Sequence, residues 1–183
     1  MSVLITGFQP FGEVLSNPSE QIAEFFGGIT LPVVRNKAFE ILKQNILQKK
    51  PSAILMTGLG RGSEKIQLER IAINLDDYLI PDNEGNQPRE QKIILTGPAA
   101  YFSTLPIQVI HQALSAQSIP VQFSLSAGSY LCNHLFFQVM HFLSVNQMTI
   151  PAGFIHIPDK MTPEELQSAF STILSVISEE HYR

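Results

Sequence analysis

Short apolar runs alternate with amphipathic segments along most of the chain, and this alternation limits the possible folds more than any other feature. The clearest runs, residues 3–5, 53–57, 121–125 and 153–157, have the length and apolar content of buried strands. The segments between them carry apolar residues at helical spacing. Strands interleaved with helices predict right-handed crossovers, and therefore a three-layer αβα fold around a mainly parallel, twisted central sheet.

Helix-capping residues and interruptions in the apolar pattern indicate where the remaining helices and strands begin and end. Helices are expected at residues 18–26, 38–48, 105–116 and 132–143, a further strand at 32–35, and a last helix after residue 162. Asn17 before Pro18 is a good N-cap, and Glu20 is placed to return a capping-box bond. Thr162 and Glu165 form the same pattern at the last helix.

Length and composition restrict the class of protein. The 183 residues predict one domain, residues 1–183, and 44% hydrophobic with 15% charged residues suit a globular core. A net charge of −4 without a dense basic patch argues against nucleic acid as a partner. The most apolar stretch, residues 135–143, is too short to span a bilayer, so no membrane association is expected. The single cysteine, Cys132, cannot form an internal disulfide, which favours a reducing cytoplasm.

Two stretches break the alternation of strands and helices. The period-2 apolar pattern changes phase between residues 68 and 71, which predicts a bulge or bend that carries Glu69 and Arg70. Residues 76–92 hold turn formers and too little apolar content to form core, so they are a candidate flap or subunit contact. The glycines at 58, 60 and 62 do not fit a dinucleotide site, because a strand-like segment follows them where a helix must open.

Cys132 follows the strand at 121–125 through a glycine-containing loop and lies at the expected start of the next helix. Unpaired N–H groups at a helix start favour a thiolate and offer hydrogen bonds to an oxyanion. The alternative is a buried structural thiol, because free cysteines are often buried. On position alone, a nucleophile and a structural thiol remain equal alternatives.

His156 and Glu69 are the candidate partners of Cys132. His156 ends the strand at 153–157, at the edge where parallel sheets gather their active-site residues, and suits a general base. Glu69, on the predicted bend, suits a third member. The competing interpretations are a satisfied structural histidine and an exposed glutamate.

The other histidines are His111, His134, His141 and His181. His111 and His181 are expected to be solvated. His134 points about 200° away from Cys132 around the predicted helix, which prevents an easy contact. A zinc site at Cys132 is disfavoured, because His134 and His141 lack a third partner. No metal is therefore expected.

Several segments, in order from residue 4 to residue 158, resemble pyroglutamyl peptidase I, also called pyrrolidone-carboxylate peptidase. The segments that carry the resemblance are residues 6–12 with 17–19, 68–74, 80–88, 127–134 and 153–158. Each match alone is modest, but their combination and order are specific to this family of cysteine peptidases.

The resemblance implies a Cys-His-Glu triad, Cys132, His156 and Glu69, that removes N-terminal pyroglutamate from peptides without a cofactor. It implies a phosphorylase/hydrolase-like α/β fold that commonly assembles as a homotetramer. The residues that match the family's substrate pocket are Phe8, Phe11, Asn17, Ile80 and Leu131.

Four residues depart from the family pattern. Leu59 replaces a common Gln, Leu68 a Pro, Leu79 an Arg and Glu13 a second Gly. Together these departures are expected to make the surroundings of Glu69 less polar, and Leu79 to remove an Arg near the oxyanion or substrate. Two other functions therefore stay open: a catalytically impaired member that binds N-terminally blocked peptides, and a nucleoside phosphorylase or hydrolase of similar topology.

Overall fold

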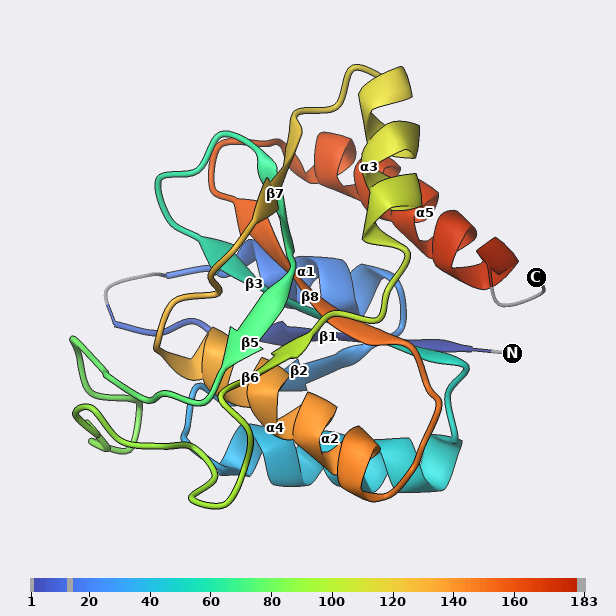
Figure 1. Cartoon of the computed structure of the whole chain (residues 1–183). Helices are drawn as coiled ribbons and strands as arrows, with labels where there is room; N and C mark the ends of the chain where they lie inside the picture. The colour runs from blue at the N-terminus through green and yellow to red at the C-terminus, as the bar shows by residue number, and fades with distance from the viewer. Residues whose placement is uncertain (1, 13–14, 181–183) are drawn as a thin grey trace.

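Six strands form a central sheet with helices on both faces (Figure 1) in a computed structural model that describes residues 2–12 and 15–180. The strands are β1 (Val3–Phe8), β2 (Ile29–Leu31), β3 (Ala53–Gly60), β4 (Ile66–Glu69), β7 (Val121–Ser124) and β8 (Ala152–Pro158). Their order across the sheet is β2-β1-β3-β8-β4-β7, and the pairs are parallel except β4 with β8. The expected three-layer α/β fold with a mainly parallel sheet is confirmed.

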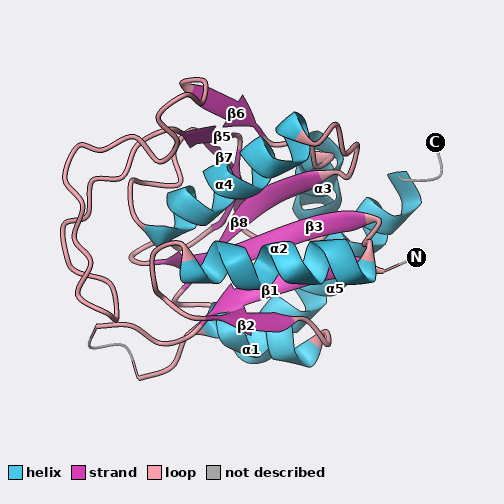
Figure 2. Cartoon of the chain, turned by 90° about the horizontal axis from the view of Figure 1, so that it is seen from below, coloured by secondary structure: helices cyan, strands magenta, loops and turns pink. Residues whose placement is uncertain are grey.

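Five helices complete the layers: α1 (Pro18–Phe25), α2 (Lys37–Lys49), α3 (Ile107–Ala116), α4 (Leu131–Val145) and α5 (Pro163–Glu180). Helices α2 and α4 pack against one face of the sheet, and α1, α3 and α5 against the other (Figure 2). Each face has its own apolar core, and every residue of β8 is buried between the two. A strand covered on both faces needs a nearly continuous apolar run, which is the pattern at residues 152–158.

The caps at two helix starts differ in how they are completed. Asn17 caps α1 as expected, with Oδ1 accepting from the Ser19 N–H at 3.0 Å, but its side-chain partner is Ser19 and not the expected Glu20. The predicted capping box at α5 is present in full. The Thr162 N–H donates to Glu165 Oε2 at 2.8 Å, and the Glu165 N–H donates to Thr162 Oγ1 at 3.2 Å.

Two predicted boundaries were wrong. The second strand lies at Ile29–Leu31, before Pro32, and residues 32–35 instead lead into α2 through Asn36, whose φ of 64° is left-handed. The helix expected from about residue 105 begins at Ile107, and Pro106, which has no N–H to donate, is its N-cap. The change of phase after residue 68 has a larger cause than a bulge. The chain leaves the central sheet after Glu69 and enters a two-stranded sheet of β5 (Ile71–Ile73) and β6 (Ala100–Phe102).

The prediction that residues 76–92 stay outside the core was also wrong. Tyr78 is fully buried and belongs to the core cluster on the α2 and α4 face. Asp76 and Asp82 are buried as well, and Asp82 Oδ1 accepts from the N–H groups of Glu84 and Asn86. Hydrogen bonds to buried carboxylates hold this segment in place, so its low apolar content did not reveal its packing.

Among the described helices, none combines the length and apolar character that a bilayer crossing requires.

Candidate active site

Cys132 lies in the first turn of α4, against the end of β3. The loop before it turns at Gly128, whose φ of 78° is one that residues with a side chain rarely adopt. A Cβ atom at Gly58 would lie 2.7 Å from Cys132 Sγ, so only glycine in β3 lets the helix start approach this closely. The thiol is partly buried and sits over the strand.

His156 and Glu69 meet across the antiparallel pair of β8 and β4. His156 is paired with Gln67 in this ladder and Glu69 with Phe154, so the two side chains are diagonal neighbours on one face. His156 Nδ1 lies 2.7 Å from Glu69 Oε1. Because His156 is also the register partner of Gly58 in β3, the structure brings Cys132, His156 and Glu69 together.

The environment favours a charged imidazole at His156. Burial lowers the pKa of His156, but the charge of Cys132 and a hydrogen bond with it, followed by the hydrogen bond and charge of Glu69, raise that pKa to about 10. Glu69 is fully buried, and within the described residues its Oε2 has no hydrogen-bond partner. With Nδ1 donating to Glu69, the other ring nitrogen is left to exchange a proton with Cys132.

Three apolar residues of the predicted pocket, which we call the apolar wall, belong to the core cluster against which Cys132 packs or pack against it themselves. Phe8 and Leu131, two of the predicted pocket residues, are buried in the core cluster against which Cys132 packs. Phe11, a third, lies with its ring centroid 6.0 Å from that of Tyr130, at the N-cap of α4. Sequence reasoning missed Tyr130, although it stands two residues before the cysteine and follows a loop that turns at a glycine.

The other two predicted pocket residues are placed differently. Asn17 is buried, but its polar atoms are engaged locally: Oδ1 accepts from Ser19, and Nδ2 donates to the Gln9 carbonyl at 3.2 Å. Its position therefore suits a support for the loop that carries Phe11. Ile80 is 43% exposed on the segment after β5, and the structure does not bring it into the core cluster of Phe8 and Leu131.

Hydrogen bonds tie the segment after β5 to the start of α4. The Asp77 N–H donates to the Ser129 carbonyl at 3.0 Å, and Ser129 Oγ donates to the Asp77 carbonyl at 2.8 Å. Tyr130 donates to the Pro81 carbonyl at 3.1 Å. Asn133 exchanges two 2.9 Å bonds with the backbone of Ile73. The position of Cys132 therefore depends on a segment that sequence reasoning treated as a separate flap.

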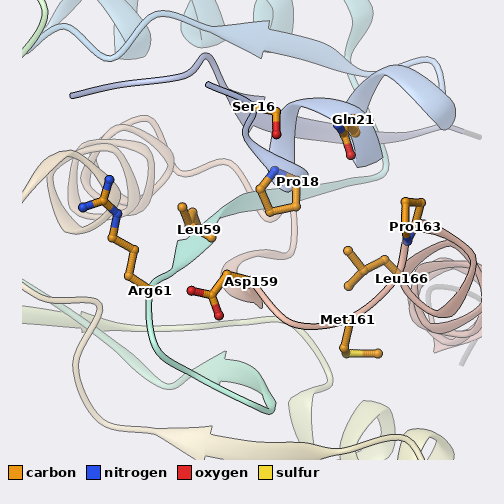
Figure 3. Close-up of a pocket in the computed structure, with 9 residues that line it drawn as sticks. All are labelled: Ser16, Pro18, Gln21, Leu59, Arg61, Asp159, Met161, Pro163 and Leu166. Carbon is orange, nitrogen blue, oxygen red and sulfur yellow. The ribbon is translucent and has the colours of Figure 1, made fainter. Parts of the chain in front are cut away.

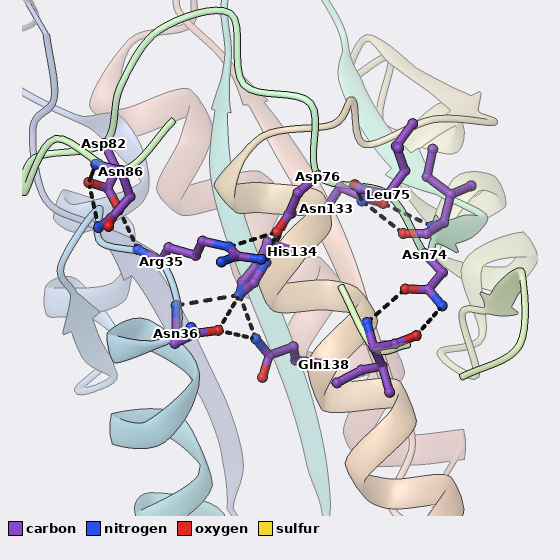
Figure 4. A network of polar contacts seen from close by, with 12 residues as sticks. Arg35, Asn36, Asn74, Leu75, Asp76, Asp82, Asn86, Asn133, His134 and Gln138 are labelled. Atoms are coloured by element: carbon purple, nitrogen blue, oxygen red, sulfur yellow. Dashed lines mark hydrogen bonds and ion pairs between the residues drawn. The ribbon is translucent and has the colours of Figure 1, made fainter. Parts of the chain in front are cut away.

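A second histidine–carboxylate pair joins His134, two residues after Cys132 on α4, to Asp76 (Figure 4). His134, fully buried, has its Nδ1 2.9 Å from Asp76 Oδ2, and that oxygen also accepts from Arg35 Nε at 2.9 Å. The Nε2 of His134 meets Asn36 Oδ1 at 3.1 Å and the amide of Gln138. As expected from the helix geometry, this ring is engaged away from Cys132.

The other histidines have separate settings. His141 Nδ1 meets the Tyr101 hydroxyl at 2.9 Å. His111 was expected to be solvated, but it is half-buried and stacks on Phe123 with a centroid distance of 4.6 Å. His181 and Glu13 lie outside the described residues. In the described part of the chain, no three His, Cys, Asp or Glu side chains are grouped to hold a metal ion.

The departures from the family pattern lie in different places. Leu68 belongs to the core cluster on the α3 and α5 side of the sheet. Leu79 is 80% exposed next to Ile80. Leu59 lines a cavity of about 590 Å³ on the α1 and α5 side of the strand ends, which we call the outer cavity (Figure 3). Its lining residues are Ser16, Pro18, Gln21, Leu59, Arg61, Asp159, Met161, Pro163 and Leu166.

Comparisons with known proteins agree with this arrangement. Two curated relatives are both named pyrrolidone-carboxylate peptidase. The one from Vibrio vulnificus is 44% identical over 95% of this chain and 85% of its own length, and the one from Thermococcus litoralis is 41% identical over 92% and 80%.

Solved structures give the same result. Pyroglutamyl peptidase I of Bacillus amyloliquefaciens superposes with a TM-score of 0.94 and 33% identity over 98% of both chains. The pyrrolidone carboxyl peptidase of Pyrococcus furiosus superposes with a TM-score of 0.94 and 37% identity over 99% of this chain and 100% of its own. A family model described as pyroglutamyl peptidase matches residues 1–177. The chain therefore belongs to the pyroglutamyl peptidase family of cysteine peptidases.

Proposed function

We propose that this chain removes N-terminal pyroglutamate from peptides, with Cys132 as nucleophile, His156 as general acid and base, and Glu69 as the group that orients the imidazole. The observation that carries the proposal is the 2.7 Å contact between His156 and the buried Glu69, beside a cysteine at a helix start. Family membership supports the reaction class.

The acylation step follows from this geometry. Sγ of Cys132 attacks the carbonyl carbon that links the pyroglutamyl group to the next residue, while His156 holds the thiol proton. The C–N bond breaks, the proton passes to the leaving amine, and a thioester remains. A water molecule then attacks the thioester, giving its proton to His156 and releasing pyroglutamate, and the thiol recovers its proton. First-turn N–H groups of α4, which have no carbonyl partner within the helix, are suited to the oxyanion.

The charge on Glu69 supports the imidazolium that forms in both steps. Because Glu69 accepts from Nδ1, it also fixes the tautomer that leaves Nε2 free for proton exchange. Phe8, Phe11 and Leu131 supply an apolar wall that suits an uncharged lactam ring better than a protonated α-amine. Ile80 lies on the neighbouring segment. It would contact the lactam ring only after that segment moved over the ring.

The test compares a fluorogenic pyroglutamyl amide with its prolyl analogue, using wild-type protein and Cys132→Ala in parallel. We expect cleavage of the lactam substrate, little cleavage of the prolyl one, and loss of activity in the variant. Activity that survives in Cys132→Ala would exclude the mechanism. A folded wild-type protein that cleaves neither substrate would favour the alternative of a binder of blocked peptides.

Assembly and location remain predictions. The homotetramer and the cytoplasm follow from the resemblance and from the single cysteine, and light scattering on the purified protein tests the first of them.

A further inference from the structure

Arg61 lies at the meeting point of the apolar wall and two cavities. Its guanidinium carbon is 5.2 Å from the centre of the Phe11 ring, the geometry of a cation–π contact. Arg61 lines the outer cavity, where Figure 3 shows its side chain extending away from Asp159. It also lines a second cavity of about 410 Å³, which we call the loop cavity. The lining residues of the loop cavity are Arg61, Gly62, Ser63, Glu64, Lys65, Gln67 and Gln122.

One residue that lines the loop cavity, Gln67, is a direct neighbour of His156 in the sheet. His156 is paired with Gln67 across β8 and β4, so both side chains lie on the same face. A Cβ atom at Gly60 would lie 3.1 Å from His156 Cβ and 3.5 Å from Gln67 Oε1, so glycine at this position keeps the passage between them clear. His156 and the loop cavity are therefore separated only by a short distance across Gly60 and Gln67.

The acidic and the basic side chains around this cavity differ in whether they have partners. Glu64 is engaged by Lys160 at 2.6 Å, and Asp159 Oδ2 accepts from the Gly62 N–H at 3.2 Å. Across residues 2–12 and 15–180, no carboxylate lies within ion-pair distance of Arg61 or Lys65. The acids near the cavity are engaged, and its two cations have no carboxylate partner among the described residues, so the site attracts negative charge.

We propose that the loop cavity binds the leaving part of the substrate and that Arg61 pairs with a carboxylate carried by the residue after pyroglutamate. This inference rests on the proposed function. A guanidinium suits such a carboxylate because its planar donors bind both oxygens at once. The carboxylate has two possible sources: the free C-terminus of a pyroglutamyl amino acid, or an acidic side chain in a longer peptide.

The experiment measures kcat/KM on three substrates that separate these sources. Pyroglutamyl-alanine carries a terminal carboxylate, its alanine amide carries none, and pyroglutamyl-aspartic acid α-amide carries only the side-chain carboxylate. We expect wild-type protein to prefer at least one acidic substrate over the neutral amide by about three- to tenfold at low salt, mainly through KM. Arg61→Gln is expected to bring this ratio close to one.

Lys49→Gln is the matched control. It removes the same charge from the last turn of α2, an element that contributes no residue to either cavity, and it is expected to keep the wild-type ratio. A wild-type ratio in Arg61→Gln would overturn the proposal, whether the rates stay at their wild-type values or fall equally on acidic and neutral substrates. An equal fall on both kinds of substrate would assign Arg61 to the support of Phe11. Wild-type protein that cleaves none of the three would instead overturn the proposed function, so the two failures are distinguishable.

Discussion

Two buried histidine–carboxylate pairs lie close to the start of α4, and they differ in what surrounds the second ring nitrogen. In both pairs the carboxylate meets Nδ1, at 2.7 Å in His156–Glu69 and 2.9 Å in His134–Asp76. Around His134 every polar atom is engaged, because Asn36 and Gln138 meet Nε2. Around His156, Glu69 Oε2 lacks a partner within the described residues, and the ring interacts with Cys132.

The difference shows that residue type does not decide which histidine is reactive. A saturated pair must break existing hydrogen bonds before it can exchange a proton with another group, so it contributes to stability. An unsaturated pair beside a thiol is free to move a proton at little structural cost. We therefore expect substitutions in the His134–Asp76 pair to affect stability, and substitutions in the His156–Glu69 pair to affect turnover.

Among substitutions in the two pairs, Glu69→Gln is expected to have the largest effect on catalysis. The amide has nearly the shape of the carboxylate but cannot stabilise the imidazolium, so kcat should fall by about 10²- to 10⁴-fold. The measurement is steady-state hydrolysis of a pyroglutamyl amide. Asp76→Asn is the matched control, compared at a temperature at which both variants are folded, and it should lower kcat far less. Equal losses in the two variants would remove the functional distinction between the pairs.

Asp76→Ala is expected to have the largest effect on stability. The substitution leaves His134 buried beside the Arg35 guanidinium without the carboxylate that joins them, and breaking a buried pair in this way costs about 3–5 kcal/mol. Urea unfolding followed by circular dichroism measures the change in the free energy of unfolding. A loss below about 1 kcal/mol would show that Asn36 and Gln138 hold His134 without the carboxylate.

Sequence reasoning identified the residues of one pair, His156 and Glu69, but not the other pair. His156 follows from a general rule, because it ends an apolar run and strand ends gather active-site residues. Glu69 was selected by its place after the glycine-rich break at residues 58–62. The antiparallel pairing of β4 with β8 that brings it to His156 depends on strand order, which periodicity does not encode.

The pair of His134 and Asp76 was not predicted. Asp76 lies in a segment that seemed too polar for a core, and its burial depends on partners such as Arg35, which is 41 residues away along the chain. Patterns of apolar residues report burial that is driven by the hydrophobic effect, but they are silent about burial that is supported by long-range hydrogen bonds. The same reason explains why the core position of Tyr78 was missed.

The pH dependence of stability gives the smallest expected effect and tests how Cys132 acts on the unsaturated pair. The pKa of His156 is raised from its ordinary 6.5 to about 10, with the Cys132 charge as the largest raising cause. The folded protein therefore keeps a proton that the unfolded chain has lost, and this stabilisation is present below about pH 6.5 and disappears as the pH rises through about 10. Urea midpoints between pH 8 and 10 should fall more steeply in wild-type protein than in Cys132→Ala. Lysines and tyrosines titrate in both proteins, so their contribution cancels, and the difference between the two slopes reports the coupled titration of Cys132 and His156 together. Parallel slopes would mean that the thiol does not carry charge beside His156, and the nucleophile would then have to be activated only after the substrate binds.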